Sequence, residues 1–309
     1  MLNYATPCLI KSTQHMSTKL PPSKRIAYQG IEGAYSHLAC TKVFPESTNI
    51  ACENFQTAIK WVEQGKADAA MIPLENSTAG RVEEIYRLLP KTHLHIVGEH
   101  FEPVNHCLLA LPGIQLQQIK TVSSHPQALA QCFHRLDDLN ITPLVAMDTA
   151  LSAKDLASKK DAISIYGSHG AIASTLAAEL YGLDVLAENF QDVLGNTTRF
   201  VILARDALTA DYEPELHYLT SILFSVRNIP AALYKALGGF ATNGINMIKL
   251  ESYMDGGTME ASHFHIDIAG HFQQQAVQNA LAELDFFGKD IRILGSYPAH
   301  KYRRKHDFV

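Results

Sequence analysis

The chain has 309 residues, of which 47% are hydrophobic and 18% are charged, so it can bury sizeable cores and is not of the disordered class. A formal net charge of -5 and a sequence pI near 6.3 exclude a strongly basic nucleic-acid-binding surface. No apolar run is long enough to cross a bilayer, so we expect neither nucleic acid nor a membrane as a partner.

The N-terminal segment and the cysteines bear on the compartment. Five cysteines are scattered without a CxxC pair, which is typical of a reducing compartment. Residues 1–23 are rich in Ser, Thr and Lys and predict a flexible tail, with no acid before Glu32. An organelle transit peptide is the alternative, but such peptides are Arg-rich and only Arg25 is present here. We therefore expect a cytoplasmic protein.

From Lys24 onward, short apolar runs alternate with amphipathic stretches, which is typical of βα units in an α/β fold. The expected order is strand 25–29, helix 35–43, helix 55–64, strand 67–74, loop 75–80, helix 81–89, strand 93–99, strand 106–110, strand 121–123, helix 126–139, strand 144–146, helix 150–158, strand 162–165, helix 168–181, strand 184–187, turn 194–197 and strand 199–204.

A second, compact unit follows a predicted linker at 213–215. Its expected order is strand 218–226, helix 230–242, strand 247–253, strand 262–268, helix 274–284 and strand 292–296. This βαββαβ order is ferredoxin-like, and Asp255-Gly256-Gly257 predicts a tight hairpin between the central strands. By analogy, a small domain of this kind on a larger α/β body suggests a regulatory module.

The first candidate site is the glycine-rich turn Gly30-Ile-Glu-Gly33-Ala-Tyr35-Ser36-His37. Glycines let the backbone bend sharply, and the free amides of a helix start can hold an anion. The segment lacks the Lys of a P-loop and the third Gly of a dinucleotide fingerprint. The alternative is a tight turn in which Ser36 caps the helix.

The second candidate site, Glu75-Asn76-Ser77-Thr78-Ala79-Gly80, directly follows an apolar strand. The carboxyl ends of strands are where α/β proteins place ligands. The Glu75 carboxyl could act there as an acid or a base if burial raised its pKa. The alternative is an ordinary polar loop that caps the next helix.

The third candidate site is Ser123-Ser124-His125-Pro126. The proline suits the first turn of a helix that points its amides toward the same region. His125 could bind or protonate a ligand because histidine titrates near neutrality. The alternative is a structural histidine beside the helix.

The fourth candidate site, Asn196-Thr197-Thr198-Arg199-Phe200, leads from a turn into an apolar strand. Arg199 is a fixed cation suited to a carboxylate, and Thr198 can donate one hydrogen bond to a leaving oxygen. The alternative for Thr198 is that threonine is simply a good strand former.

The histidine pairs His93/His95 and His263/His265 each face one side of a strand. No third ligand or cysteine stands at a recognisable spacing, so neither a metal nor another cofactor is expected.

In content and order, these four segments resemble the prephenate dehydratase family, from about Lys24 to Tyr302. The stretches GAYSH, ENST, SHP and NTTRF are specific in combination. The resemblance implies a catalytic region over 24–205 with two α/β lobes, similar to the bilobal periplasmic binding proteins, and a substrate cleft between them. It also implies a ferredoxin-like ACT domain over 216–300, followed by a short tail over 301–309.

The resemblance further implies decarboxylating dehydration of prephenate to phenylpyruvate in L-phenylalanine biosynthesis. Thr198 matches the threonine that is essential in the family, and we expect a carboxylic acid such as Glu75, or water, to give the proton. Residues expected to hold the substrate are Ser36, Asn76, Ser77, Thr78, His125, Thr197, Arg199 and Phe200.

The same resemblance implies control by phenylalanine. Residues expected to bind this effector are Ala231, Leu233, Asn243, Gly244, Ile245, Asn246, Leu250, Glu251 and Ser252. Tyr253-Met254 stands where the family often has Arg-Pro, and Ala231-Ala232-Leu233-Tyr234 where it often has Gly-Ala-Leu-Val, which leaves the strength and sign of the response open. A homodimer or homotetramer is implied as well. The alternatives are an arogenate dehydratase and a non-catalytic amino-acid-sensing binding protein.

Overall fold

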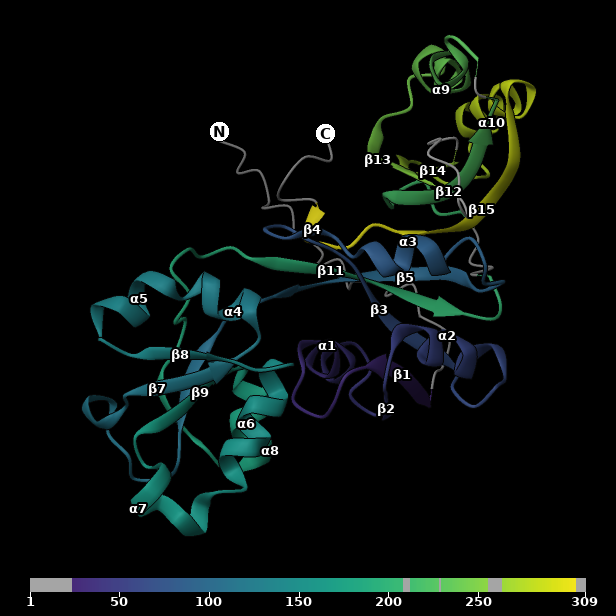
Figure 1. Cartoon of the computed structure of the whole chain (residues 1–309). Helices are drawn as coiled ribbons and strands as arrows, with labels where there is room; N and C mark the ends of the chain where they lie inside the picture. Colours follow the sequence, from purple (N-terminus) through teal and green to yellow (C-terminus); the bar gives the residue numbers. More distant parts are fainter. Residues whose placement is uncertain (1–23, 208–211, 228, 255–262, 304–309) are drawn as a thin grey trace, which may run out of the picture.

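The computed structural model of the chain describes residues 24–207, 212–227, 229–254 and 263–303. These residues form three β-sheets with helices packed against them, a mixed α/β fold (Figure 1). The predicted tail over 1–23, the hairpin turn at 255–257 and the last six residues of the predicted C-terminal tail lie outside the described residues. Across the described ranges, no helix is both long and apolar enough to cross a membrane.

The first sheet has six strands, in the order β2-β1-β3-β11-β5, with β4 paired to β3. Strand β1 pairs in parallel with β2 and β3, whereas β11 runs antiparallel to both β3 and β5. The elements are β1 Arg25–Gln29, α1 Tyr35–Val43, β2 Thr48–Cys52, α2 Phe55–Glu63, β3 Ala69–Asn76, β4 Gly80–Arg81, α3 Glu83–Leu88, β5 His95–Pro103 and β11 Thr197–Ala204. Strand β11 thus returns from late in the chain to lie between two early strands.

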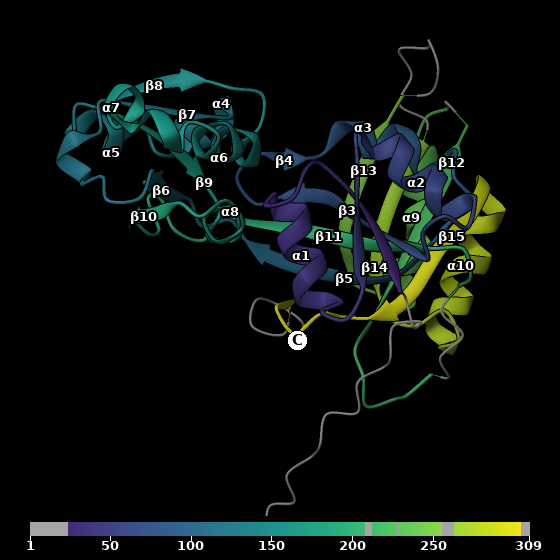
Figure 2. The same cartoon turned by 90° about the horizontal axis from the view of Figure 1, so that it is seen from below.

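The second sheet has five strands, in the order β10-β6-β9-β7-β8. Its elements are β6 Cys107–Ala110, β7 Thr121–Ser124, α4 Pro126–Gln131, α5 Phe133–Asp138, β8 Thr142–Val145, α6 Thr149–Ala157, α7 Ile163–Tyr166, β9 His169–Ala173, α8 Thr175–Tyr181 and β10 Asp184–Ala187. The chain enters this part between β5 and β6 and leaves it between β10 and β11. The first and second sheets therefore form two lobes joined by two crossings (Figures 1 and 2).

The third sheet has four antiparallel strands, in the order β13-β14-β12-β15. Its elements are β12 Tyr218–Val226, α9 Ala232–Thr242, β13 Met247–Tyr253, β14 His263–Ala269, α10 Gln275–Phe287 and β15 Gly288–Pro298. The predicted βαββαβ order is confirmed, and the strand arrangement is ferredoxin-like.

The first sheet lies between helix α1 and the ferredoxin-like sheet (Figure 1). One face packs on α1 through residues such as Met71 and Phe200. The other face packs on the ferredoxin-like sheet, where Ile72 of β3 joins a core with Leu219 and Leu294. Because side chains alternate along a strand, neighbouring residues of β3 and β11 belong to different surroundings.

Two predicted elements of the second lobe are wrong. The predicted strand at 162–165 is helical, and its Ile165 is 72% exposed. The predicted helix over 168–181 begins only at Thr175, because Ser174 caps α8 by accepting from the Ala177 N–H. Residues His169–Ala173 form the strand instead, and a short buried apolar run does not distinguish strand from helix.

Smaller differences concern strand ends and interruptions. Strand β2 was not predicted because its mixed sequence, Thr-Asn-Ile-Ala-Cys, lies at a sheet edge. The predicted helix over 126–139 is divided at Cys132, whose φ of -116° ends α4 and precedes α5. The predicted loop over 75–80 is shorter, because β3 continues through Asn76 and returns as β4.

We predict that Gly295→Ala loosens the contact between β15 and β5. A Cβ on Gly295 would overlap the backbone carbonyl of Ile96, so the strands would have to separate. Overpacking of this kind costs roughly 1–3 kcal/mol, measurable by urea unfolding. As a control, Gly238→Ala in α9 meets no atom within 4 Å and should stabilise the helix by up to about 1 kcal/mol. Unchanged stability of Gly295→Ala would contradict the close approach.

Candidate functional site

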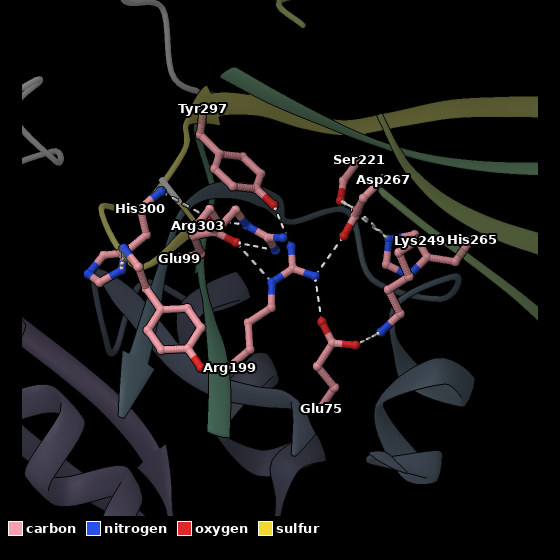
Figure 3. Close-up of polar contacts among 11 residues, drawn as sticks. Glu75, Glu99, Arg199, Ser221, Lys249, His265, Asp267, Tyr297, His300 and Arg303 are labelled. Carbon is pink, nitrogen blue, oxygen red and sulfur yellow. Dashed lines mark hydrogen bonds and ion pairs between the residues drawn. The ribbon is translucent and has the colours of Figure 1, made fainter. Parts of the chain in front are cut away.

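Strands β3 and β11 place Thr198 and Arg199 on opposite faces of the first sheet. In their antiparallel register, Thr198 lies opposite Asn76 and Arg199 lies opposite Glu75. Successive strand side chains point to opposite faces, and a register shift follows Arg199. Thr198 and Asn76 bond to each other on one side. Arg199 and Glu75 bond to each other toward the ferredoxin-like sheet, as Figure 3 shows.

Asn76 fixes the hydroxyl of Thr198. Its Nδ2 donates to Thr198 Oγ1 at 3.0 Å and to Asn196 Oδ1 at 2.7 Å, while its Oδ1 accepts from the backbone N–H groups of Thr78 and Ala79. Because the amide N–H can only donate, the Thr198 oxygen is the acceptor and its own O–H proton is left for another partner. Within the described part of the chain, no acceptor for that proton is present. Thr198 is half-buried, so a ligand can reach it.

A chain of hydrogen bonds continues from Asn196 into the second lobe. Gln131 Oε1 accepts from Asn196 Nδ2 at 3.2 Å and lies 2.8 Å from His106 Nε2. The hydroxyl of Tyr35 lies 3.0 Å from His106 Nδ1 and donates to the Asn105 carbonyl at 2.8 Å. Burial lowers the pKa of His106, so its ring is neutral near pH 7. Since Gln131 Oε1 can only accept, we assign the ring proton to Nε2, which leaves Nδ1 and the Asn105 carbonyl to share the single O–H proton of Tyr35.

Ser77 and Thr197 close the loop beside Thr198. Ser77 Oγ accepts from the Thr197 N–H at 2.9 Å, and the Ser77 N–H donates to the Thr197 carbonyl at 2.9 Å. The structure thus brings together five of the residues expected to act on a substrate. We refer to Asn76, Ser77, Thr78, Thr197 and Thr198 as the Thr198 site.

Ser36 and His125 have other surroundings. Ser36 is 8% exposed in the first turn of α1, and Ala34 precedes it as N-cap, so capping by Ser36 is wrong. His125 is exposed and caps α4 by accepting from the Gln127 N–H at 3.2 Å. That contact fits the structural interpretation of His125. Among the described residues, no hydrogen bond joins either side chain to the Thr198 site.

Arg199 is 2% exposed, and its guanidinium is occupied within the protein (Figure 3). Its Nε donates to Glu99 at 2.9 Å, its Nη1 to Glu75 at 2.8 Å and Asp267 at 2.7 Å, and its Nη2 to the Tyr297 hydroxyl at 3.0 Å. Four of its five N–H groups thus donate to protein partners on the side away from Thr198, an arrangement that does not favour the expectation that Arg199 holds a substrate carboxylate.

Phe200, which is also expected to hold the substrate, is a core residue in the structure. It is 1% exposed and packs in the core between the first sheet and α1. The next residue along β11 after the buried arginine thus serves the fold rather than the site.

The carboxylates around Arg199 are ionised. Burial alone would raise the pKa of Asp267, but Arg199 beside it holds that pKa well below its usual range. Arg199 likewise lowers the pKa of the buried Glu99, and together with Lys249, which donates to the second oxygen, that of Glu75. Glu75 therefore carries no proton near neutral pH. Its ionised state and its place on the face opposite Thr198 favour water, the other expected source, as the proton donor.

The C-terminal end of the described chain completes this arrangement. Glu99 accepts from Arg303 Nε at 2.7 Å and from the His300 N–H at 3.1 Å. Three carboxylates and three cations thus lie together between the first sheet and the ferredoxin-like sheet. We refer to Glu75, Glu99, Arg199, Lys249, Asp267, Tyr297 and Arg303 as the Arg199 cluster.

The residues expected to bind an effector fall at both ends of α9. Ala231 and Leu233 stand at its start and Asn243–Asn246 at its end, about 16 Å apart for 11 residues of helix. A cavity of about 380 Å³ opens at the second end, and Asn243, Gly244, Ile245, Tyr218, Pro214 and Gln274 contribute to its lining. Leu250, Glu251 and Ser252 lie on β13, where Glu251 pairs with Arg81 of β4 at 3.1 Å.

Four polar residues of the site were missed: Tyr35, His106, Gln131 and Asn196. Tyr35 and Asn196 stand inside the motifs that pointed to the site, whereas His106 and Gln131 reach it only through the fold. Glu102 was missed as well. It lies opposite Thr198 on β5, is 1% exposed and is held by Lys42 at 2.5 Å and His100 at 2.9 Å. In the described ranges, no group of three or more His, Cys, Asp or Glu residues is suited to a metal.

Comparison with known proteins gives a family for these features. Residues 26–208 match the family model of prephenate dehydratase. A bifunctional N-acyl-homoserine lactone acylase/prephenate dehydratase of Komagataeibacter europaeus is 45% identical over 283 residues, which cover 91% of this chain and 98% of that protein. Arogenate dehydratase/prephenate dehydratase 1, chloroplastic, of Arabidopsis thaliana is 43% identical over 288 residues, which cover 89% of this chain and 72% of that protein.

Solved structures give the same result. The prephenate dehydratase of Arthrobacter aurescens in complex with L-Phe matches with a TM-score of 0.79 at 33% identity, covering 89% of this chain and 92% of that one. A structure described as GqqA, a novel type of quorum quenching acylase, matches with a TM-score of 0.83 at 44% identity, covering 91% of this chain and 100% of that one.

We predict that Arg199→Met destabilises the fold by about 3–5 kcal/mol at pH 7, because Asp267 would stay buried without this cation and Glu99 would keep only Arg303. In the wild type, the pKa values of these carboxyl groups are lower in the folded than in the unfolded state. The groups therefore stabilise the folded state at pH values above their unfolded pKa, and this stabilisation is lost as the pH falls through the folded pKa. In the variant, burial would raise the pKa of Asp267, because Arg199 would no longer offset it. The difference in free energy of unfolding between the wild type and the variant should therefore become smaller between pH 7 and about pH 4.

The control for this prediction is Arg205→Met. Among the residues that the structure describes, Arg205 donates only to the backbone carbonyls of Val62 and Ala67, so its loss should cost about 1–3 kcal/mol without such a pH dependence. Chemical unfolding at several pH values measures both variants. If the free energy of unfolding lost in Arg199→Met did not change with pH, the assignment of charges in the cluster would be contradicted.

Proposed function

This chain belongs to the prephenate dehydratase family and is a carbon–oxygen lyase, and from this premise we propose that Thr198 assists departure of the substrate hydroxyl in a cleft between the two lobes. In the reaction, the bond from the ring to its carboxylate breaks and the carbon–oxygen bond to the hydroxyl breaks. The electron pair of the first bond enters the ring, and the hydroxyl leaves with one proton as water. Aromatisation supplies the driving force, so the protein needs to orient the substrate and stabilise the departing oxygen.

The observation that carries this proposal is the direction of one hydrogen bond. Asn76 donates to Thr198, which leaves the Thr198 O–H free to donate to a departing oxygen. Asn76 is itself fixed by the loop N–H groups that its oxygen accepts from. The donor is thus held in place before the substrate arrives, which is the arrangement that stabilises developing negative charge most effectively.

We propose that water supplies the proton for the departing hydroxyl. A threonine hydroxyl is too weak an acid to give up its proton, and Glu75 is ionised on the other face of the sheet. For the substrate carboxylates, we propose the backbone N–H groups of the first turn of α1, near Ser36, which have no partner within the helix. The neutral amides of Asn196 and Gln131 would complete the polar lining.

The remaining assignments concern regulation and assembly. We propose that 24–205 is the catalytic region and 216–300 an ACT domain that binds phenylalanine, as supported by similarity to a dehydratase solved with L-Phe. The expected effector residues at the start of α9 stand about 16 Å from those at its end, so we propose that one site combines them across two copies of the chain. This supports a homodimer or homotetramer.

Prephenate and arogenate differ in one group, a side-chain keto oxygen in place of an ammonium. The hydrogen-bonded chain at the Thr198 site contains only neutral groups, and the nearby carboxylate of Glu102 is already paired with Lys42 and His100, so neither attracts an ammonium strongly. We expect kcat/KM for prephenate to exceed that for arogenate by about tenfold or more, equivalent to about 1.4 kcal/mol. The test incubates the protein with each substrate and follows phenylpyruvate and phenylalanine. Equal or greater efficiency with arogenate would make arogenate the substrate.

We predict that Thr198→Val lowers kcat on the order of 10²–10³ with little change in KM, because one donor to the transition state is lost while the shape is kept. Steady-state formation of phenylpyruvate measures both constants. Thr48→Val on the exposed edge strand β2 is the control and should match the wild type. A folded Thr198→Val enzyme with turnover near that of the wild type would remove Thr198 from the mechanism.

A further inference from the structure

We propose that the Arg199 cluster transmits the state of the ferredoxin-like sheet to the Thr198 site, and that the contact of Lys249 with Glu75 is the link that changes. This inference rests on the proposed function and names the route by which that site is regulated. Arg199 and Glu75 act in it as positioning residues, since neither touches the substrate.

The first argument is the geometry of the two catalytic strands. Arg199 and Glu75 are paired across β11 and β3, and the residues next to them, Thr198 and Asn76, are paired in the same ladder. A strand is continuous, so a displacement of the Arg199–Glu75 pair shifts the backbone that carries Thr198 and Asn76. The contact between these last two is a single hydrogen bond of 3.0 Å, whose strength depends on distance and angle.

The second argument is the origin of the partners. Arg199 bonds to Asp267 of β14 and Tyr297 of β15, and Glu75 bonds to Lys249 of β13 (Figure 3). Three of the four strands of the ferredoxin-like sheet therefore contact one pair of residues on the catalytic strands. All these contacts are directional and charged or charge-assisted, so they respond to small shifts more steeply than apolar packing does.

The third argument is the position of Lys249. It directly precedes Leu250, Glu251 and Ser252, the residues of β13 expected to bind the effector. Strand β13 lies at the edge of its sheet and pairs only with β14, with a register shift between Met247 and Lys249. A strand paired on one side can move more readily than the central strands that carry Asp267 and Ser221. Lys249 is 9% exposed and also lies over the Tyr86 ring, so it cannot follow β13 without changing its contact with Glu75.

The test compares phenylalanine binding by calorimetry in the absence and presence of saturating phenylpyruvate. A coupled wild-type enzyme should show an affinity change of about 5–150-fold, with turnover of prephenate altered by phenylalanine as well. In Lys249→Met, whose side chain has similar length but no charge, phenylalanine should still bind while the affinity change falls to within about twofold. Lys249→Arg, which can again bond to Glu75, should restore the coupling.

The matched control is Arg292→Met. Arg292 also joins the ferredoxin-like sheet to the first lobe, but through the backbone carbonyls of Leu89 and Pro90, away from β3 and β11. It should therefore keep the wild-type coupling. If Lys249→Met does not fold, Lys249→Gln replaces it with the same expected result.

Three results would overturn the inference. The first is a Lys249→Met variant in which phenylpyruvate changes the phenylalanine affinity as much as in the wild type. The second is an equal loss of coupling in Arg292→Met. The third is a wild-type enzyme whose phenylalanine affinity is the same with and without phenylpyruvate. Failure of the proposed function is distinguishable, because it would appear as a wild-type protein that turns over neither prephenate nor arogenate.

Discussion

The guanidinium of Arg199 is the group on which both sides of the first sheet depend. A buried cation is tolerated only when its charge and its N–H groups are matched, and here three carboxylates and a tyrosine hydroxyl match them. Two of these partners, Asp267 and Tyr297, come from the ferredoxin-like sheet. Arg199 on β11 therefore has these two partners only when the ferredoxin-like sheet is in place.

Buried ion pairs are weak evidence for stability, because apolar residues of the same volume often serve as well. Their usual advantage is specificity, because a buried charge makes the one arrangement in which it is paired more stable than alternative arrangements. In this protein the apolar contact between the sheets already buries Ile72, Leu219 and Leu294. The Arg199 cluster adds directional bonds to that contact, which fix how the two sheets lie on each other.

The side chains of neighbouring residues of β11 point to different sides, so one short motif contributes to three different environments. Thr198 faces the site with Asn76, Arg199 faces the ferredoxin-like sheet, and Phe200 enters the core on α1. The sequence predicted a strand only from Arg199 onward, whereas β11 begins at Thr197, so the alternation that separates Thr198 from Arg199 follows from the structure. The identity of the partners was beyond prediction, because Glu99 and Asp267 lie 100 and 68 residues from Arg199.

The Thr198 site was predictable in part for a different reason. The loop after β3 and the segment before β11 are both polar stretches at the ends of apolar strands, and the fold pairs those strands directly. His106 and Gln131 could not be found in this way, because they come from the second lobe. The wrong assignments at 162–173 lie in the same lobe. There the apolar residues Ile163 and Ile165 predicted a strand but are exposed, whereas the strand is the following segment, His169–Ala173, which contains Gly170.

The distribution of charge fits the chemistry of the family. Prephenate dehydration converts an anion with two carboxylates into an aromatic product, and the reaction is driven from within the substrate. A free arginine beside the ring carboxylate would stabilise that carboxylate and oppose its loss as neutral CO2, since only interactions stronger in the transition state speed a reaction. With Arg199 on the opposite face, the proposed site avoids this penalty, and its proposed donor to the departing oxygen is the neutral Thr198, held by Asn76. The cation next to the threonine can then serve to position the strand without binding the group that must leave.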